Sequence, residues 1–437
     1  FACDIRPSSE MNPILLKPQG NSTSEIIHLG KSVGVSTAKD YYKDWFTSGW
    51  RVIKKSLKSI YKQNPNCRLI IEGAGSPVEM NLIHRDLTNL KVAKYLEANC
   101  ILVADIERGG VFAQVVGTLE LMKPEEKKLI KGIIINRFRG DLSLFEEGKK
   151  WIESKTKIPV LGIIPWLNEN FPPEDSLDLL ERKNKSTNPE IKVGIIRFPS
   201  ISNFSDFDPL QNEESISISW IQNSQRLDEY DFLILPGSKQ TIKDQIFLQK
   251  SGLLNDIKDY SSKNGNIFGI CGGLQMLGTL LEDPFAKEGL EINNKKSVQG
   301  IGLLPLKTTF LKDKKTSQVK SESLWPCLCN IEGFEIHNGI SELDQNQNIS
   351  KIKPLFKNFD LGWYLENNGS GTIAGTYIHG IFENDIWRDS YINKIRKNKK
   401  LPKISKKISS YKIKKELILN ILENIFKKNL NIDSLLT

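Results

Sequence analysis

The sequence lacks any run of eighteen apolar residues, so no segment has the composition of a membrane-spanning helix. Its first residues, FACDIRPSSEMNP, have neither the basic flank nor the apolar core of a secretory signal peptide. They also lack an initiator methionine, and we therefore expect that the sequence begins inside a longer protein. The chain of 437 residues exceeds the usual size of one domain, which favours two.

Cysteine and histidine are both scarce, with 6 and 4 residues. The cysteine spacing gives no disulfide framework, and the close pair Cys327 and Cys329 has no second pair to complete a zinc site. These features are typical of a reducing compartment, and we expect a cytoplasmic location.

The formal net charge is +9, but the lysines are spread along the chain, with one dense basic region at 394–415. No pattern of stacking aromatics accompanies this region, so we expect no nucleic-acid partner. A substrate that carries several carboxylates would be attracted by such a surface.

Short apolar runs followed by polar or glycine-rich turns recur along both halves of the chain. The runs lie at 68–75, 100–110, 131–141, 158–165, 191–199, 230–238 and 265–273. Continuous apolar runs at this spacing predict parallel strands that are buried on both faces, with ligands bound at their carboxyl ends. The polar break at 181–190 predicts a linker.

The sequence thus predicts an α/β protein with two domains, 1–185 and 191–437. We expect a surface loop at 311–323, because this segment is rich in lysine and serine. The tail after Arg388 alternates lysine with isoleucine and leucine, and we expect it to end in a helix.

Cys271 lies in the stretch NIFGICGGLQMLG, directly after an apolar run. A strand, a sharp turn and a helix over this stretch would form a nucleophile elbow, in which glycines permit the tight turn. The amino terminus of the helix would favour the thiolate. The backbone N–H of Gly272 would be the first candidate to hold an oxyanion. The alternative is a structural cysteine packed in a glycine-rich turn.

A nucleophilic cysteine needs a base, which is usually histidine. His28 and His84 lie in the first half of the chain, whereas His337 and His379 lie in the same half as Cys271. His379, in GTYIHGIF, follows an apolar run and precedes glycine, which suits an exposed position at a strand end. We therefore interpret His379 as the base; a structural histidine is the alternative.

With LPGSKQT upstream and GTYIHGIF downstream, the stretch GICGGLQMLG resembles the class I glutamine amidotransferase domain, a flavodoxin-like fold, of the cobyric and cobyrinic acid synthases. The resemblance implies that Cys271 attacks the side-chain amide of glutamine and that His379 is the base. It also implies that Gly237, in LPGS, supplies the second oxyanion donor.

One position departs from the wider class, which carries a glutamate two residues after the histidine. The residue here is Ile381. The resemblance therefore implies a Cys–His pair without that acid, as in the cobyric branch.

The first half is similar to the ATP-dependent amidoligase domain of the same family, a relative of dethiobiotin synthetase with a P-loop-NTPase-like fold. The matching segments are MNPILLKP (11–18), EGAGSPVEMNL (72–82), DIERGGVFAQVVGT (105–118) and INRFRGD (135–141). The resemblance implies ATP and Mg²⁺.

Polar residues in these segments are candidates for nucleotide and metal binding. Glu72, at the end of an apolar run, is placed to hold Mg²⁺ that bridges nucleotide phosphates, and Glu79 could contribute to the same site. Asn136 matches the position at which this ATPase group reads adenine. Asp105 is a further candidate, although Glu107 and Arg108 could hold it in a plain ion pair. Each acid could instead be a helix cap or a surface charge.

The phosphate-binding loop that such a domain requires is missing from the sequence. The stretch EIIHLGKS (25–32) ends in Gly-Lys-Ser, but Glu25 occupies the position at which a Walker A motif needs its first glycine. We therefore reject this stretch as a P-loop. Either the sequence is truncated at its start or the ATP-dependent step is absent.

The family resemblance implies glutamine-dependent, ATP-driven amidation of the peripheral b, d, e and g carboxylates of adenosylcobyrinic acid a,c-diamide, which yields adenosylcobyric acid in cobalamin biosynthesis. Glutamine and a corrinoid are then the small-molecule partners. One alternative is a cobyrinic acid a,c-diamide synthase. The other is a non-catalytic relic or regulator, because the Walker A motif is absent.

Overall fold

The structure is a computed structural model of the chain. It describes residues 5, 7–20, 23–37, 40–41, 43, 45–81, 86–167, 189–288, 296–366, 371–404 and 410–431. The predicted linker at 181–190 lies almost wholly outside the described residues, which resume at residue 189.

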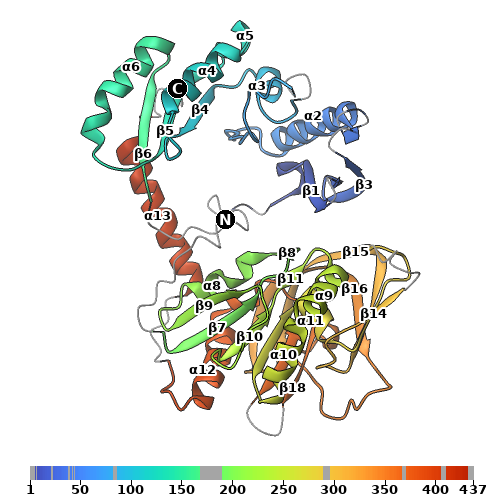
Figure 1. Cartoon of the computed structure of the whole chain (residues 1–437). Helices are drawn as coiled ribbons and strands as arrows, with labels where there is room; N and C mark the ends of the chain where they lie inside the picture. The colour runs from blue at the N-terminus through green and yellow to red at the C-terminus, as the bar shows by residue number, and fades with distance from the viewer. Residues whose placement is uncertain are drawn as a thin grey trace. The chain divides into compact units, whose positions relative to one another are not determined.

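The chain divides into two compact units, which are drawn in Figure 1. The first comprises Phe1–Glu169 with Leu417–Thr437, and the second comprises Asn170–Glu416. The sequence assigned the whole of 191–437 to one domain, and this assignment is wrong for the end of the chain. The reason is packing: Leu430 lies against Ile134, Leu161 and Ile164 of the first unit.

A parallel sheet with the order β4-β5-β6 forms the core of the first unit. Its elements are β4 (Cys100–Asp105), α4 (Val111–Leu121), α5 (Pro124–Lys127), β5 (Ile130–Phe138), the 3-10 helix η3 (Leu142–Phe145), α6 (Glu146–Thr156) and β6 (Val160–Pro165). On β5, Ile133 and Ile135 are buried together with Val115 of α4 and Ile152 of α6, whereas Ile134 lies in the cluster with Leu430. This alternation along a strand that is buried on both faces confirms the strands predicted at 100–110, 131–141 and 158–165.

The strand predicted at 68–75 does not form: residues 67–74 are in no strand, and Ile70 is 90% exposed. An apolar run becomes a strand only when a neighbouring strand satisfies its backbone groups. Within the described residues β4 is an edge strand, and Val103 on it is 58% exposed. The expectation of burial on both faces is therefore wrong for β4.

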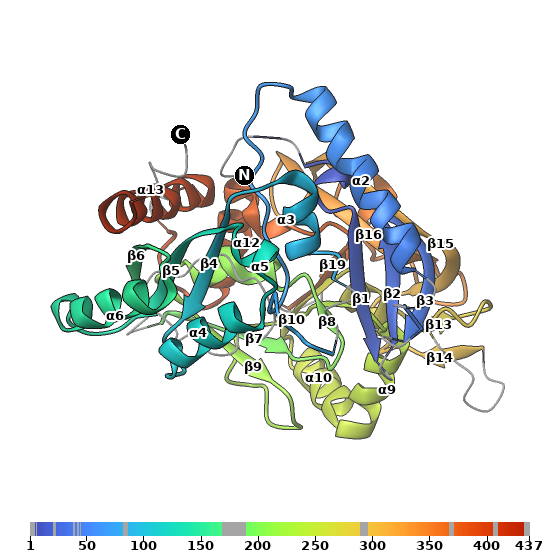
Figure 2. The same ribbon diagram turned by 90° about the horizontal axis from the view of Figure 1, so that it is seen from above.

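A second, antiparallel sheet in the first unit was not predicted. Its strands are β1 (Ile14–Gly20), β2 (Thr23–His28) and β3 (Lys31–Thr37), and Figure 2 shows them side by side. Leu29 and Gly30 form the β2–β3 hairpin turn with φ of 50° and 77°, so Gly-Lys-Ser runs from a hairpin turn into a strand. The rejection of this stretch as a P-loop is thereby confirmed. The 3-10 helix η1 (Ser9–Met11) precedes this sheet, and the helices α2 (Phe46–Gln63) and α3 (Leu90–Leu96) follow it.

The second unit is built on a sheet with the order β17-β18-β19-β12-β10-β7-β9. Its strands are β7 (Ile191–Ile196), β9 (Ile216–Ile221), β10 (Phe232–Leu235), β12 (Asn266–Ile270), β17 (Lys353–Pro354), β18 (Gly362–Glu366) and β19 (Thr372–Thr376). The five from β9 to β19 run parallel, and β18 and β17 run antiparallel to their neighbours. The predicted strands at 191–199, 230–238 and 265–273 are therefore confirmed.

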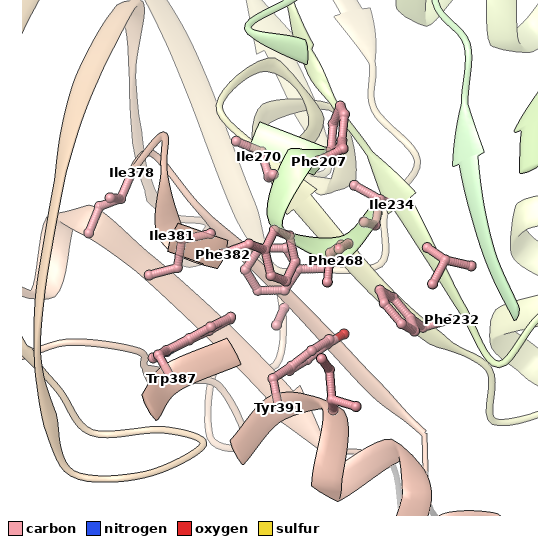
Figure 3. Packing of buried hydrophobic residues seen from close by; sticks show 14 of the residues in the cluster. Phe207, Phe232, Ile234, Phe268, Ile270, Ile378, Ile381, Phe382, Trp387 and Tyr391 are labelled. Carbon is pink, nitrogen blue, oxygen red and sulfur yellow. The ribbon is translucent and has the colours of Figure 1, made fainter. Parts of the chain in front are cut away.

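Helices cover both faces of this sheet. They are α8 (Asp208–Gln211), α9 (Thr241–Ser251), α10 (Leu253–Ser262), α11 (Gly272–Leu277) and α12 (Asp385–Asn398), with short 3-10 helices η4 (Phe204–Phe207), η6 (Phe359–Leu361) and η7 (Ile381–Glu383). Leu233 and Leu235 of β10 pack with apolar residues of α9, α10 and α11. On the other face, Figure 3 shows Phe268, Phe382, Trp387 and Tyr391 gathered in one aromatic cluster.

A four-stranded sheet with the order β14-β13-β15-β16 extends the second unit. Its strands are β13 (Leu280–Glu282), β14 (Ser297–Gln299), β15 (Leu306–Ser323) and β16 (Cys329–Leu343). The surface loop predicted at 311–323 is therefore wrong. Residues 315–323 of β15 pair with β16, and the polar side chains of this part are largely exposed, so pairing rather than burial makes it a strand.

The strands β8 (Ile201–Ser202) and β11 (Gly237–Ser238) pair in a two-stranded antiparallel ribbon. In the chain, β8 follows β7 and β11 follows β10. The helix α13 (Tyr411–Asn429) confirms the helical tail. Within the described residues, no helix combines the length and the apolar character that a bilayer span requires.

Candidate active site

Cys271 sits at a sharp turn between β12 and α11. Its φ of 51° and ψ of −106° are unusual for a residue with a side chain, as expected for a nucleophile elbow. Added side-chain carbons show why glycines flank it: a Cβ on Gly269 would lie 2.7 Å from the Leu274 nitrogen, and one on Gly273 would lie 1.9 Å from the Leu235 carbonyl oxygen. The predicted strand, turn and helix are therefore present.

His379 follows β19, the strand that pairs in parallel with β12. The Cys271 N–H donates to the Thr376 carbonyl at 2.7 Å, so both functional residues leave neighbouring strands at the same edge of the sheet. The structure brings them together, but not on the surface. His379 is fully buried and Cys271 is 5% exposed, which corrects the exposed position that the sequence predicted for the histidine.

Asp206, which the sequence did not single out, holds the imidazole of His379. One carboxylate oxygen lies 2.7 Å from Nδ1 of His379, and the other accepts from the Gly380 N–H at 2.7 Å. Asp206 is 2% exposed and lies in η4, which follows β8. The implied pair without an acid is therefore incomplete, because a carboxylate reaches the histidine from another part of the chain.

Ile381, which replaces the usual glutamate, is a residue of the hydrophobic core. Ile381 is fully buried in the apolar cluster with Phe268 and Trp387.

One signal could have pointed to Asp206: it lies in a polar segment after the first strand of this sheet, where ligand-binding residues collect.

Burial alone would lower the pKa of His379, but the Asp206 carboxylate and then Cys271 more than reverse this effect and raise it to about 10. A raised pKa keeps the imidazole protonated at neutral pH. His379 is therefore a proton donor beside the Cys271 sulfur.

The β8–β11 ribbon passes along one side of this pair. A Cβ on Gly237 would lie 3.1 Å from Cε1 of His379, so the glycine backbone lies directly against the imidazole ring. A Cβ on Gly272 would lie 2.9 Å from the Ser238 nitrogen. The structure therefore gathers both predicted oxyanion residues around Cys271 and His379.

The strand β16 passes along another side of the pair. Phe334 stacks on His379 with ring centroids 5.2 Å apart, and the two residues exchange backbone hydrogen bonds. The Ile336 carbonyl oxygen lies 3.5 Å from Sγ of Cys271. The other histidine of this unit, His337, is bonded to Glu335 and to the Gly339 carbonyl. This arrangement favours His379 over His337 as the partner of Cys271.

In the first unit, Asp105 and Asn136 are register partners at the carboxyl ends of β4 and β5. Asp105 pairs with Arg137 at 3.4 Å and accepts from the Glu107 N–H at 2.8 Å. Its ion-pair partner is thus Arg137, and not the Arg108 considered from the sequence. The structure brings these two predicted nucleotide-binding residues together.

Glu72 and Glu79 lie in the segment before α3 that forms no strand, and both are exposed. Within the described part of the chain, no group of three or more His, Cys, Asp or Glu side chains is arranged to hold a metal ion. These residues therefore do not fit a preformed Mg²⁺ site, and we derive no reaction step through the metal.

Both halves of the chain match known protein families. Residues 192–387 match the CobB/CobQ-like glutamine amidotransferase domain, and residues 42–173 match an AAA domain. The match to the AAA domain supports the use of ATP by the first unit.

Curated relatives match the whole chain. The cobyric acid synthase of Prochlorococcus marinus subsp. pastoris is 75% identical over 100% of this chain and 86% of the relative. Those of the Prochlorococcus marinus strains MIT 9312 and NATL2A are 73% and 59% identical, with the same coverage. A solved structure titled as a glutamine amidotransferase aligns with 46% of this chain and 97% of its own at 13% identity, with a TM-score of 0.35.

Two domain matches in the expected order and full-length relatives at high identity lead to one conclusion: the chain belongs to the cobyric acid synthase family of glutamine-dependent amidoligases.

Proposed function

We propose that the chain catalyses the glutamine-dependent, ATP-driven amidation of the b, d, e and g carboxylates of adenosylcobyrinic acid a,c-diamide, with Cys271, His379 and Asp206 as the glutaminase centre. The observation that carries the glutaminase part is the buried contact between Asp206 and His379, at 2.7 Å, beside a cysteine at a nucleophile elbow. A cysteine with a purely structural role does not need a protonated imidazole beside it, whereas a nucleophilic cysteine does.

The first step forms a thioester. The Cys271 thiolate attacks the side-chain carbonyl carbon of glutamine, and the carbonyl oxygen becomes an oxyanion. We assign the Gly237 and Gly272 N–H groups as the donors to this oxyanion. His379 then gives its proton to the departing nitrogen, and ammonia leaves a glutamyl thioester on Cys271.

The second step restores the enzyme. His379, now neutral, takes a proton from water as the water attacks the thioester. Glutamate leaves, and the thiolate and the protonated imidazole are both regenerated. Asp206 stabilises the protonated imidazole in each half-reaction and fixes the ring orientation through Nδ1, a role that a buried carboxylate commonly has beside a catalytic histidine.

The ammonia is used by the first unit. We propose that ATP activates a corrinoid carboxylate there as an acyl phosphate and that ammonia displaces the phosphate to form the amide. Asp105 and Asn136, which are neighbours at the ends of β4 and β5, are our candidates for contact with the nucleotide. A cytoplasmic location is part of this proposal, and the free thiols of the described cysteines support it.

Labelling of the chain with an electrophilic glutamine analogue, such as a diazoketone, tests the glutaminase assignment. We expect one adduct per chain by intact mass and peptide mapping to place it on Cys271. Glutamine should protect the thiol. An adduct on another cysteine, or no adduct while glutamate is still released, would overturn the assignment of Cys271.

A further inference from the structure

Asp244 is a buried carboxylate that the reaction steps above do not use. It lies in the first turn of α9 and is 1% exposed. A charged side chain so deeply buried is retained only where its oxygens are satisfied by hydrogen bonds. The partners of these oxygens therefore indicate what Asp244 does.

The two carboxylate oxygens of Asp244 contact the two strands of the β8–β11 ribbon. One oxygen accepts from the Ser238 hydroxyl at 2.5 Å, and Ser238 belongs to β11. The other accepts from the Ser200 N–H at 3.2 Å, and Ser200 immediately precedes β8. Asp244 thus holds the ribbon at the end away from the β8–Asn203 junction.

Each strand of the ribbon carries a group that contacts His379. On β11, Gly237 lies against the imidazole ring. The strand β8 leads directly into Asn203, whose side-chain nitrogen is 3.0 Å from Nε2 of His379, and then into Asp206. A small shift between the strands would therefore move the oxyanion donor and the acid of the centre relative to each other.

We propose that Asp244 is a positioning residue of the glutaminase centre, which fixes the register of the β8–β11 ribbon and so holds Gly237 and the Asn203–Asp206 segment at their working distances from His379. This inference rests on the proposed glutaminase activity. The described hydrogen bonds of the Asp244 carboxylate go to Ser238 and Ser200 and not to Cys271 or His379, so it acts through the ribbon.

Glu288 provides a matched control. It is also a buried carboxylate at the amino terminus of α9, where it accepts from the Ile242 N–H at 3.4 Å, and burial raises its pKa as it does that of Asp244. Its carboxylate accepts from backbone N–H groups at the start of α9, and its own N–H donates to Asp283 at 2.8 Å. It lies close enough to repel the charge of Asp244, but no described hydrogen bond joins it to the ribbon. Loss of either carboxylate removes a helix-terminal interaction, but only the loss of Asp244 releases the ribbon.

The test compares glutamate release by the parent chain, Asp244→Asn, Glu288→Gln, Ser238→Ala and the Asp244→Asn/Ser238→Ala double variant. We expect kcat to fall about 10-fold or more in Asp244→Asn with KM within about threefold of the parent, because the ribbon acts in the transition state. Glu288→Gln should keep kcat within about threefold. Ser238→Ala should lower kcat, and the double variant should be no worse than Asp244→Asn, because both changes break the same contact.

Thermal unfolding of each variant shows whether it is folded at the assay temperature. If Asp244→Asn does not fold, Ser238→Ala, which removes a single hydroxyl, still decides the matter. A kcat of Ser238→Ala equal to that of the parent would then overturn the proposal, as would equal kcat values for Asp244→Asn and Glu288→Gln. Absence of glutamate release by the parent would overturn the proposed function, and this inference with it.

Discussion

The predicted site residues of the two units are held in opposite ways. In the second unit, Cys271 and His379 are buried, and their neighbours Asp206 and Phe334 fix them with hydrogen bonds and ring stacking. In the first unit, Glu72 and Glu79 are exposed, and Asp105 is half-buried in a surface ion pair with Arg137. Catalysis needs groups that are oriented before the substrate arrives, and Cys271 and His379 of the second unit meet this requirement.

One chain thus carries a preorganised centre in the second unit and exposed candidate residues in the first. Substitutions in the second unit should therefore cost much rate or stability. Substitutions of the candidate residues in the first unit should leave glutamine hydrolysis and stability nearly unchanged.

The largest effect is expected for Cys271→Ala, which removes the nucleophile. Glutamate release should fall by about 10³-fold or more, equivalent to ~4 kcal/mol of transition-state stabilisation. An enzyme-coupled glutamate assay measures it. Cys67→Ala, which removes an exposed thiol of the first unit, is the control and should match the parent. Retained activity in Cys271→Ala would show that the buried centre of the second unit is not the glutaminase site.

Ile381→Glu tests where the third member of the centre comes from. A carboxylate at this fully buried position would lie among apolar side chains, and we expect the free energy of unfolding to fall by about 3 kcal/mol or more. Urea denaturation measures the loss. The contrary result would be an Ile381→Glu variant as stable as the parent, together with an Asp206→Asn/Ile381→Glu double variant that regains the activity lost in Asp206→Asn. The acid could then be supplied from either position.

Asp206→Asn should lower kcat by about 10²-fold, or ~2.7 kcal/mol, because the protonated imidazole loses its partner. The pKa of His379 is raised from its ordinary value of 6.5 to about 10 in the folded chain. Activity that depends on the protonated imidazole should therefore fall as the pH rises through about 10. In the variant this alkaline limit should move to lower pH, as a pH–rate profile would show.

The same shift has a consequence for stability. Because the folded pKa of His379 is above the unfolded one, its contribution to the free energy of unfolding is fully present below pH 6.5 and is lost as the pH rises through about 10.

Asp208→Asn is a matched control for the pH–rate profile, since Asp208 is equally buried but bonds Tyr411. An unchanged alkaline limit in Asp206→Asn, or an equal shift in Asp208→Asn, would count against the role of Asp206.

The smallest effect is expected for Asp105→Asn in the first unit. Its ion pair with Arg137 is half-exposed, so the free energy of unfolding should change by less than about 1 kcal/mol. Glutamate release should be unchanged, whereas ATP-dependent amidation should slow. Parallel assays of glutamate and of the amidated corrinoid separate the two. A matching loss in both activities would show that the two units are not independent in this respect.

The strands of both parallel sheets could be predicted because their signal is local: a run such as Ile133–Ile135 is apolar at consecutive positions. The run around Ile70 has the same signal but no strand to pair with, and β15 has the pairing without the apolar signal. Both errors arise because strand formation depends on distant neighbours.

In the candidate active site, too, local motifs could be predicted and long-range contacts could not. Cys271 and its glycines form a local motif, and His379 could be chosen from four histidines. For Asp206 the sequence offers only its place in a polar segment after the first strand of the sheet. Its role comes from a contact across 173 residues and from burial that only the fold creates.

Mass spectrometry of the corrinoid product tests the central claim most directly. The full chain is incubated with adenosylcobyrinic acid a,c-diamide, ATP and Mg²⁺, and with either glutamine or ammonium as the nitrogen source, beside Cys271→Ala. We predict stepwise amidation by the parent with both nitrogen sources, and by Cys271→Ala with ammonium alone. Glutamate release by the parent with no change in the corrinoid from either source would contradict the claim that this chain is an amidoligase.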